Sequence, residues 1–368
     1  MKKIGIREIA RLADVSPGTV DRALHGRKGI TEETRRRILA IAERVGYTPD
    51  LAARALSVGR APIRVGVCIP REIRHYFDHL LDGILTEARR FERLGVQVLY
   101  SPTERLGLDE VEKASELLSR QLDALLLTPG NPDALAPVID EAERQGTRVI
   151  CVDTDAPQSR RSTAVCIDAD VCGRLAAELL TSFQPAGSDV VVITGMLAIE
   201  DHARKTAGFQ SMYAELTSGG PAVEVIEAHE EEEEAFQKCF ELLSRRPSIA
   251  GLYVNTANCL PVCRAICASG LSGKIRLITT DLFKAMVPYF EKGTISASIH
   301  CRPFAQGEIA MRLALDHILN GSPLPPAHLL LPHVAMRSNF RLFREVLSQP
   351  EPPALGSSFM HVVDKVEA

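Results

Sequence analysis

The chain has 368 residues, a formal net charge of −4 at pH 7 and 45% hydrophobic residues. None of its apolar runs approaches the roughly 20 residues that a membrane-spanning helix needs, which excludes a helical membrane protein. It has nine cysteines, an odd number, and no apolar signal segment. These features argue against a disulfide-stabilised secreted domain and favour reduced thiols in the cytoplasm.

Charge is divided unevenly along the chain. Residues 1–60 hold 13 Lys and Arg against 7 Asp and Glu, a net of +6, whereas the other residues hold 30 against 40, a net of −10. Contacts to the phosphates of a nucleic acid are the usual reason for such a basic segment. The alternative is a small solvated helical bundle with a chance excess of arginine.

Residues 1–48 are predicted to form three short helices. Apolar residues recur at helical spacing over residues 6–13, and a second helix begins sharply after a turn, because Ser16 suits the N-cap and Pro17 the first helical position. Thr31 is expected to cap a third helix, whose apolar face packs on the other two. Two amphipathic helices around a tight turn are what a chain needs to place a helix in the DNA major groove.

The outward side chains of the second helix are short or polar, which suits a groove better than a core. Arg22 is the strongest candidate for contacting bases, because a guanidinium pairs bidentately with guanine. The other outward residues of this helix are Pro17, Gly18, Thr19 and Asp21.

The segments VSPGTVDRALHG and ITEETRRRILAIAERVGYTPDLAARAL resemble the head of the lac repressor (LacI/GalR) family of bacterial transcription regulators. The resemblance implies a helix-turn-helix whose recognition helix contacts bases through its first residues. Pro17 and Gly18 offer almost no donor or acceptor where many relatives carry longer polar side chains, and Asp21 stands where serine is frequent. The residues expected to contact DNA are Ser16, Pro17, Gly18, Thr19, Asp21, Arg22, Arg54 and Leu56.

Residues 49–62 are predicted to form a hinge helix and a linker. The resemblance implies that this helix orders only when a dimer binds its operator, and that Leu56 wedges between base steps in the minor groove, bending the duplex. The alternative is that Leu56 packs on the rest of the protein. The residues after it, from Gly59 to Pro62, have linker composition.

From residue 63 onward apolar strands alternate with helical stretches, which is the pattern of a parallel sheet covered on both faces. This α/β body is too large for a single core, so two lobes with a ligand cleft between them are expected. We predict the body over residues 63–346, with lobe 1 at about 63–168 and 302–330 and lobe 2 at about 169–301 and 331–346.

The body resembles the ribose-type periplasmic sugar-binding proteins, which implies a doubly wound, two-lobed sensor that binds a sugar, a polyol or a sugar derivative. Tyr76 and Phe77 match the aromatic side chains that stack on a sugar ring, and Asp153 matches a carboxylate that binds hydroxyl groups. For each polar residue the alternative is a strand-end side chain that caps the next helix. The expected effector-binding residues are Arg71, Tyr76, Phe77, Asp153, Asp201, His202, Lys205, Asn255, Asp281 and Cys301.

One departure concerns Cys301, which stands where the sugar-binding group commonly has glutamine. The donor and acceptor of that amide are lost, and His300 or Arg302 would have to replace them. Because Arg71 and Arg74 would suit a carboxylate or a phosphate, an anionic ligand is one expectation.

Three other features are given structural explanations. Cys259, Cys263 and Cys267 are spaced four apart, which predicts one helix face in the core rather than a metal site. The acidic run 230–234 is interpreted as a solvated helix start. The tail at 347–368 is expected to be mobile, with a contact by the HVV segment near its end left open.

These patterns predict a homodimeric, effector-controlled transcription regulator, most often a repressor in this family, that binds double-stranded operator DNA. No cofactor or metal is expected. The alternatives are an architectural or constitutive DNA binder with a vestigial cleft, and an enzyme acting on sugars. The enzyme is disfavoured because the phosphate-binding, nucleophile-elbow and zinc-protease motifs are missing from the sequence. The effector, the direction of its effect and the operator sequence stay open.

Overall fold

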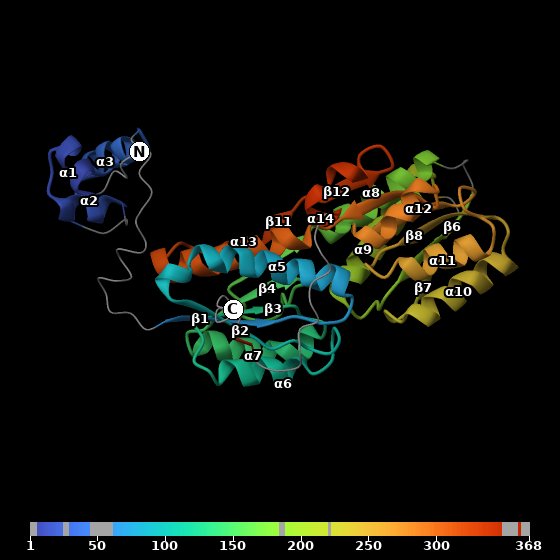
Figure 1. Ribbon diagram of the computed structural model, residues 1–368, viewed down its shortest axis with the longest axis horizontal. Helices are drawn as coiled ribbons and strands as arrows, with labels where there is room; N and C mark the ends of the chain where they lie inside the picture. Colours follow the sequence, from blue (N-terminus) through green and yellow to red (C-terminus); the bar gives the residue numbers. More distant parts are fainter. Residues whose placement is uncertain are drawn as a thin grey trace, which may run out of the picture.

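The structure is a computed structural model that describes residues 6–24, 29–44, 62–183, 188–219, 222–347 and 360–361. The predicted hinge helix, with Arg54 and Leu56, lies outside these residues. The body is α/β with two sheets, as predicted. Figure 1 shows the helices of the N-terminal head and the two layered lobes of the body.

The head is a bundle of α1 (Ile6–Ala13), α2 (Pro17–Leu24) and α3 (Glu32–Arg44). Both predicted N-caps are confirmed: the Thr19 N–H donates to Ser16 Oγ at 3.2 Å, and the Thr34 N–H donates to Thr31 Oγ1 at 3.2 Å. The three helices share one buried apolar cluster, formed by Ile9, Ala10, Ala13, Val20, Ala23, Ile38, Ile41 and Ala42.

The first lobe is built on a seven-stranded sheet with the order β11-β5-β4-β3-β1-β2-β13. Its first five strands in the chain are parallel, and so is β11, whereas the two-residue β13 is antiparallel to β2. The strands are β1 (Ile63–Cys68), β2 (Val96–Tyr100), β3 (Ala124–Leu127), β4 (Arg148–Asp153), β5 (Thr163–Ile167), β11 (His328–Leu330) and β13 (Met360–His361).

Helices cover both faces of this sheet (Figure 1). α5 (Arg74–Arg90) and α13 (Pro303–Asn320) pack on one face, and α6 (Glu110–Leu118) and α7 (Pro132–Arg144) pack on the other. Gly83 allows α5 and α13 to approach closely, because a Cβ there would lie 2.0 Å from the carbonyl oxygen of Phe304. α5 begins shortly after the carboxyl end of β1, at the edge of the sheet that faces the second lobe (Figure 1).

The second lobe is built on a six-stranded sheet with the order β12-β10-β9-β8-β6-β7, parallel except for β12. Its strands are β6 (Asp189–Thr194), β7 (Glu224–Glu227), β8 (Ile249–Val254), β9 (Arg276–Thr280), β10 (Ile295–His300) and β12 (His333–Met336). Its helices are α8 (Ala169–Phe183), α9 (Glu200–Leu216), α10 (Glu232–Arg245), α11 (Leu260–Ala268), α12 (Val287–Glu291) and α14 (Arg344–Leu347).

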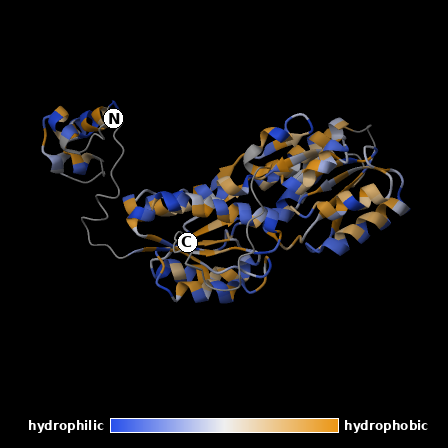
Figure 2. Cartoon of the chain, viewed as in Figure 1, coloured by the Kyte–Doolittle hydropathy of each residue, from blue (hydrophilic) through white to orange (hydrophobic). Residues whose placement is uncertain are grey.

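The central strands are apolar on both faces, as a parallel sheet between two helical layers requires, whereas the edge strands β7 and β11 are partly exposed. Every residue of β3 and β5 is buried, and Figure 2 shows hydrophobic strands inside helices whose outer faces are hydrophilic. Among the strands that the structure describes, the chain changes sheet four times: between β5 and β6, between β10 and β11, between β11 and β12, and between β12 and β13. The parallel strands of each lobe therefore end beside these crossings.

The contact left open for the HVV segment is present, because Met360–His361 pair with β2 and place His361, the first residue of that segment, opposite Leu99. Leu347, at the expected start of the tail, belongs to α14. One expectation about the body needs correction. The cysteine-lined helix face is only partly buried, since Cys267 is exposed whereas Cys259 and Cys263 are buried. Within the described ranges, His, Cys, Asp and Glu form no group of three or more suited to a metal ion, and no helix could span a membrane.

Candidate functional site

A cavity lies between the lobes, where loops after the parallel strands of both sheets meet. This is the usual place for a ligand in open α/β sheets. One wall comes from the start of α5 and the loops after β2 and β4, and the other from the start of α9 and the loops after β7, β8 and β9. The lining residues are Ile73, Tyr76, Phe77, Leu106, Asp153, Thr154, Asp201, His202, Lys205, Glu230, Thr256, Ala257 and Asp281.

The first wall joins two aromatic rings to a carboxylate. The rings of Tyr76 and Phe77 pack edge to face, with centroids 5.1 Å apart. The Tyr76 hydroxyl donates a hydrogen bond to Asp153 Oδ1 and accepts one from Gln306 Nε2 at 3.3 Å. Burial, and then repulsion by Asp201, raise the pKa of Asp153 to about 7. Asp153 is therefore held by Tyr76 through one of its two carboxylate oxygens.

A buried ion pair stands on the opposite wall. Lys205 Nζ lies 2.5 Å from Asp201 Oδ2, one helical turn away on α9, and the two side chains are only 7% and 11% exposed. Burial acts to lower the pKa of Lys205, but attraction by Asp201 outweighs it and holds that pKa well above its usual value. Lys205 is therefore a protonated side chain whose charge is matched by Asp201.

His202 is a neutral group at neutral pH. Burial lowers its pKa to about 4, against the opposing attraction of Asp201. The Met196 N–H donates to His202 Nδ1 at 3.2 Å, and His202 Nε2 lies 3.7 Å from Glu230 Oε1. The ring thus presents Nε2 to the carboxylate without supplying a positive charge.

Glu230 corrects the interpretation of the acidic run as a solvated helix start. Its side chain is only 5% exposed and lines the cavity, whereas Glu232 and Glu233 belong to the exposed first turn of α10. Burial, and then repulsion by Glu72, raise the pKa of Glu230 to about 7. The sequence offered no signal for this role, because five consecutive acidic residues look alike.

The local backbone explains why Glu230 points inward. His229 and Glu230 both have left-handed φ values, 48° and 58°, so the chain reverses before α10 begins. The His229 N–H is fixed by the carbonyl oxygen of Gly195 at 3.0 Å. Gly195 also leaves room for the carboxylate, since a Cβ there would lie 1.9 Å from Glu230 Oε1. This turn and this glycine therefore place a carboxylate in the cavity.

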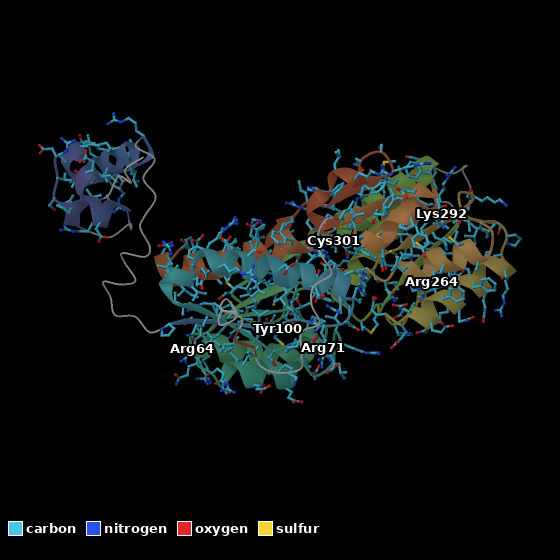
Figure 3. The ribbon with its side chains drawn as sticks, viewed as in Figure 1. Arg64, Arg71, Tyr100, Arg264, Lys292 and Cys301 are labelled. Atoms are coloured by element: carbon cyan, nitrogen blue, oxygen red, sulfur yellow. The ribbon has the colours of Figure 1, made fainter. Side chains whose placement is uncertain are left out.

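Asp281 follows β9 and is buried at the base of the cavity. Its Oδ1 accepts a hydrogen bond from the Cys301 N–H at 2.9 Å and lies 3.7 Å from His300 Nδ1. Cys301 contributes through its backbone, and its thiol is buried beside the cavity rather than in its lining. Figure 3 shows Cys301 where the two lobes meet.

Three expected binding residues do not line the cavity. Asn255 is fully buried and donates through Nδ2 to the His202 carbonyl at 3.2 Å and to Thr206 Oγ1 at 2.9 Å, so it anchors α9. Arg71 pairs with Glu104. Cys301 is the third, as described above. The residues that the structure brings to the cavity are Tyr76, Phe77, Asp153, Asp201, His202, Lys205 and Asp281.

Charges on the cavity wall oppose the expectation of an anionic ligand. Arg71 is engaged with Glu104, and Arg74 pairs with Asp78 at 3.0 Å. Neither arginine lines the cavity. Lys205 does line it, but its charge is already paired with Asp201. The carboxylates would repel an incoming carboxylate or phosphate.

Two side-chain bridges connect the lobes beside the cavity. Arg105, in the loop after β2, forms an ion pair with Glu231 in front of α10. His75 Nε2 lies 3.0 Å from the carbonyl oxygen of Ala257, and the His75 ring packs against Phe283 with centroids 3.7 Å apart. These contacts close the lobes over the cavity.

In the head, the expected base-contacting residues lie on the outward face of α2. Ser16, Pro17, Gly18 and Arg22 are exposed, and Thr19 and Asp21 are half-buried. Arg22 Nη1 donates to the Gly29 carbonyl oxygen at 3.4 Å, so its guanidinium lies against the segment that leads into α3.

Comparison with known protein families identifies both the body and the head of the chain. Residues 65–322 match the family described as "Periplasmic binding protein domain". The chain belongs to this family. Its residues 5–50 match "Bacterial regulatory proteins, lacI family", which confirms the resemblance of the head to the lac repressor family. The chain thus combines a lacI-type head with a body of the periplasmic binding protein domain family.

Individual relatives agree with both parts. The chain is 35% identical over 133 residues to the sucrose operon repressor of Klebsiella pneumoniae, covering 34% of this chain and 37% of the relative. It is 24% identical over 214 residues to catabolite control protein A of Priestia megaterium, covering 58% and 61%. The chain thus matches less than two thirds of the length of these relatives.

A solved structure shares the fold of the body. GanP, a glucose-galactose binding protein from Geobacillus stearothermophilus, superposes with a TM-score of 0.69 at 24% identity, covering 76% of this chain and 99% of GanP. The two-lobed architecture predicted from the strand pattern is thereby confirmed.

Proposed function

We propose that this protein is a transcription regulator whose affinity for operator DNA is controlled by a small polyhydroxylated ligand bound between the lobes. The observation that carries the proposal is a cavity whose walls come from both lobes, in a chain that begins with a helix-turn-helix. A ligand held by both walls favours the closed arrangement, and a head linked to the body can respond to that change.

The chemistry of the cavity supports a sugar or polyol as the ligand class. Aromatic rings such as Tyr76 and Phe77 pack on the apolar face of a sugar ring, and carboxylates such as Asp153 and Asp281 accept hydrogen bonds from hydroxyl groups. Both relatives described above are regulators by name, which favours a sensor over an enzyme.

DNA binding is proposed to involve two copies of the chain. Each head would place α2 in a major groove, with Arg22 contacting guanine, and the hinge segments, with Arg54 and Leu56, would meet in the minor groove. A homodimer suits a pseudo-palindromic operator, because its two-fold symmetry is matched by that of the DNA. We place the protein in the cytoplasm, where its DNA target lies.

The test begins with selection of a binding sequence from a randomised duplex pool, using the full-length protein. The selected duplex is then titrated in the presence and absence of sugars and polyols found by thermal shift. We expect a two-fold symmetric binding sequence and at least one ligand that changes DNA affinity. Ligands that bind without changing DNA affinity would favour a constitutive or architectural DNA binder. Turnover of a sugar would favour an enzyme.

A further inference from the structure

The carboxylates that line the cavity outnumber its cationic side chains. Asp153, Asp201, Glu230 and Asp281 face one ammonium group, that of Lys205, and the described lining contains no arginine. Lys205 lies 2.5 Å from Asp201, so its charge is already balanced. His202 adds no positive charge near neutral pH, because burial lowers its pKa to about 4. The remaining three carboxyl groups have no cationic partner on the wall.

Two of these three carboxyl groups are held by the protein. Asp153 accepts a hydrogen bond from the Tyr76 hydroxyl, and Asp281 accepts one from the Cys301 N–H at 2.9 Å. Each of them thus has one oxygen fixed in place by a neutral donor. These neighbours set the orientation of both carboxyl groups, whose oxygens can still accept further hydrogen bonds.

Glu230 differs because it is buried and has no such donor. Its side chain is 95% hidden from solvent, and neither carboxylate oxygen has a partner in good hydrogen-bond geometry among the described residues. The nearby Thr256 hydroxyl acts on this carboxyl group, but its lowering effect on the pKa is smaller than the raising effect of burial. A buried carboxylate without a partner is costly, and such a group is retained where a ligand or a special role compensates for it. The turn at His229 and the space above Gly195 place it there, so its position is built into the fold.

The missing partner is best supplied by a ligand that carries positive charge. We propose, building on the proposed sensor function, that the effector contains a protonated amine and that Glu230 binds this ammonium group, as in an amino sugar or an aminocyclitol. An ammonium group brings three donors, whereas the hydroxyl of a neutral sugar brings one, and its hydrogen bonds to a carboxylate are roughly twice as strong as neutral ones. The same carboxylates would repel an anionic sugar.

The proposal is tested with ligand pairs that differ only in charge at one position. D-glucosamine, D-galactosamine, D-mannosamine and scyllo-inosamine are each compared with the hydroxyl counterpart by calorimetric titration of the full-length protein near neutral pH. N-acetyl-D-glucosamine controls for the larger substituent, and D-glucuronate and D-glucose 6-phosphate represent anions. We expect at least one amine to bind at least about tenfold more tightly than its hydroxyl counterpart. Both anions should bind more weakly than that amine and more weakly than its hydroxyl counterpart.

Variants of the acidic run locate the effect. Glu230→Gln keeps the size and removes the charge, so the preference for the amine should fall to about twofold or less, while Glu230→Asp should retain part of it. Glu233→Gln is the matched control, because Glu233 lies three residues away on the exposed first turn of α10 and receives a hydrogen bond from Gln237. Thermal melting of each variant verifies that it is folded.

The outcomes separate the ligand class from the sensor function. Equal or tighter binding of the hydroxyl or anionic counterparts, failure of all four amines to bind, or a preference that survives in Glu230→Gln would overturn the role of Glu230. A neutral sugar that binds and changes DNA affinity would overturn this inference while leaving the sensor function standing. An amine that binds with the expected preference but leaves DNA affinity unchanged would support the inference and contradict the sensor function.

Discussion

At the scale of single residues, burial of the Glu230 carboxyl group places it for ligand binding but lowers the stability of the fold. Its pKa is raised from 4.5 to about 7, chiefly by burial, so the folded protein retains a proton that the unfolded chain releases across this interval. The contribution of Glu230 to stability is therefore lost as the pH rises from about 4.5 to about 7, and the full penalty is present above that interval. A group placed for binding thus weakens the fold under the conditions in which it binds.

We expect Glu230→Gln to be more stable than the wild type at about pH 8, by about 2–3 kcal/mol in the free energy of unfolding, and nearly equal to it at about pH 4.5. Urea denaturation of both proteins at the two pH values measures the difference. Glu233→Gln, on the exposed helix turn, should show little change at either pH. An equal effect of Glu230→Gln at both pH values would contradict the raised pKa.

Asn255 illustrates the limits of sequence at this scale. Its place after β8 made it a reasonable candidate for binding hydroxyl groups, yet its amide is used to hold the His202 carbonyl and Thr206. An asparagine at the end of a strand has the same sequence pattern whether it binds a ligand or holds a neighbouring helix. Glu230 shows the opposite case, because its burial depends on a left-handed turn and on Gly195, which lies 35 positions earlier in the chain. Such long-range complementarity is not encoded in any local pattern.

We expect Asn255→Ala to lower the free energy of unfolding by about 1–3 kcal/mol, because the His202 carbonyl and the Thr206 hydroxyl lose a buried donor. The preference for amine over hydroxyl ligands should persist, since Glu230 is unchanged. Denaturation combined with the paired titrations measures both quantities. Loss of that preference in a stable Asn255→Ala protein would assign Asn255 to the ligand site.

At the scale of elements, the bridge between Arg105 and Glu231 joins the loop after β2 to the turn before α10. It joins the two lobes beside the cavity, so it can form only when the lobes are closed. Because both side chains are about half exposed, the pair is weak, and the closed state depends also on the His75 contacts with Ala257 and Phe283. The bridge therefore adjusts ligand release rather than deciding whether the ligand binds.

We expect Arg105→Ala to increase the ligand dissociation rate about two- to fivefold with little effect on association. Stopped-flow measurements with a bound ligand provide both rates. Arg144→Ala is the matched control, since Arg144 forms an exposed pair with Glu141 within α7. A slower dissociation in Arg105→Ala would mean that the bridge opposes closure.

The elements themselves were largely predictable. Apolar runs and turn residues located the strands, because parallel strands buried on both faces leave a strong hydrophobic signal. Ser16 and Thr31 located two helix starts through their caps. The two-residue β13 could not be located in this way, because Met360 and His361 form too short a strand to show any period. Its pairing depends on the free edge of β2.

The hinge segment, which lies outside the described residues, carries a prediction from the family resemblance. We expect Leu56→Ala to weaken binding to the selected operator by at least about tenfold, because a wedge between base steps is lost, while melting of the body is unchanged. A titration with the selected duplex measures this. Leu108→Ala, which removes an exposed body side chain, should bind DNA normally. Full affinity in Leu56→Ala would remove the wedge from the proposal.

At the scale of the whole molecule, coupling between cavity and head has to be reciprocal. If a ligand changes operator affinity by some factor, the operator changes ligand affinity by the same factor, and useful regulation needs about 1–3 kcal/mol of coupling. We expect ligand titrations of the protein alone and of its complex with the operator to differ by that same factor. Unequal factors at equilibrium would show that the observed effect is not a direct linkage of the two sites.

The repeated passage of the chain between the sheets also has a consequence for biosynthesis. The first lobe contains β1 to β5 but also α13 and β11, which are translated only after nearly all of the second lobe. The second lobe in turn lacks β12 until β11 has been translated, and the first lobe still lacks β13, which follows β12. Neither sheet is therefore complete until the last part of the chain has been translated, and a chain released early would leave both with an open sheet edge. The two halves of the sensor mature together or are exposed together to quality-control proteases.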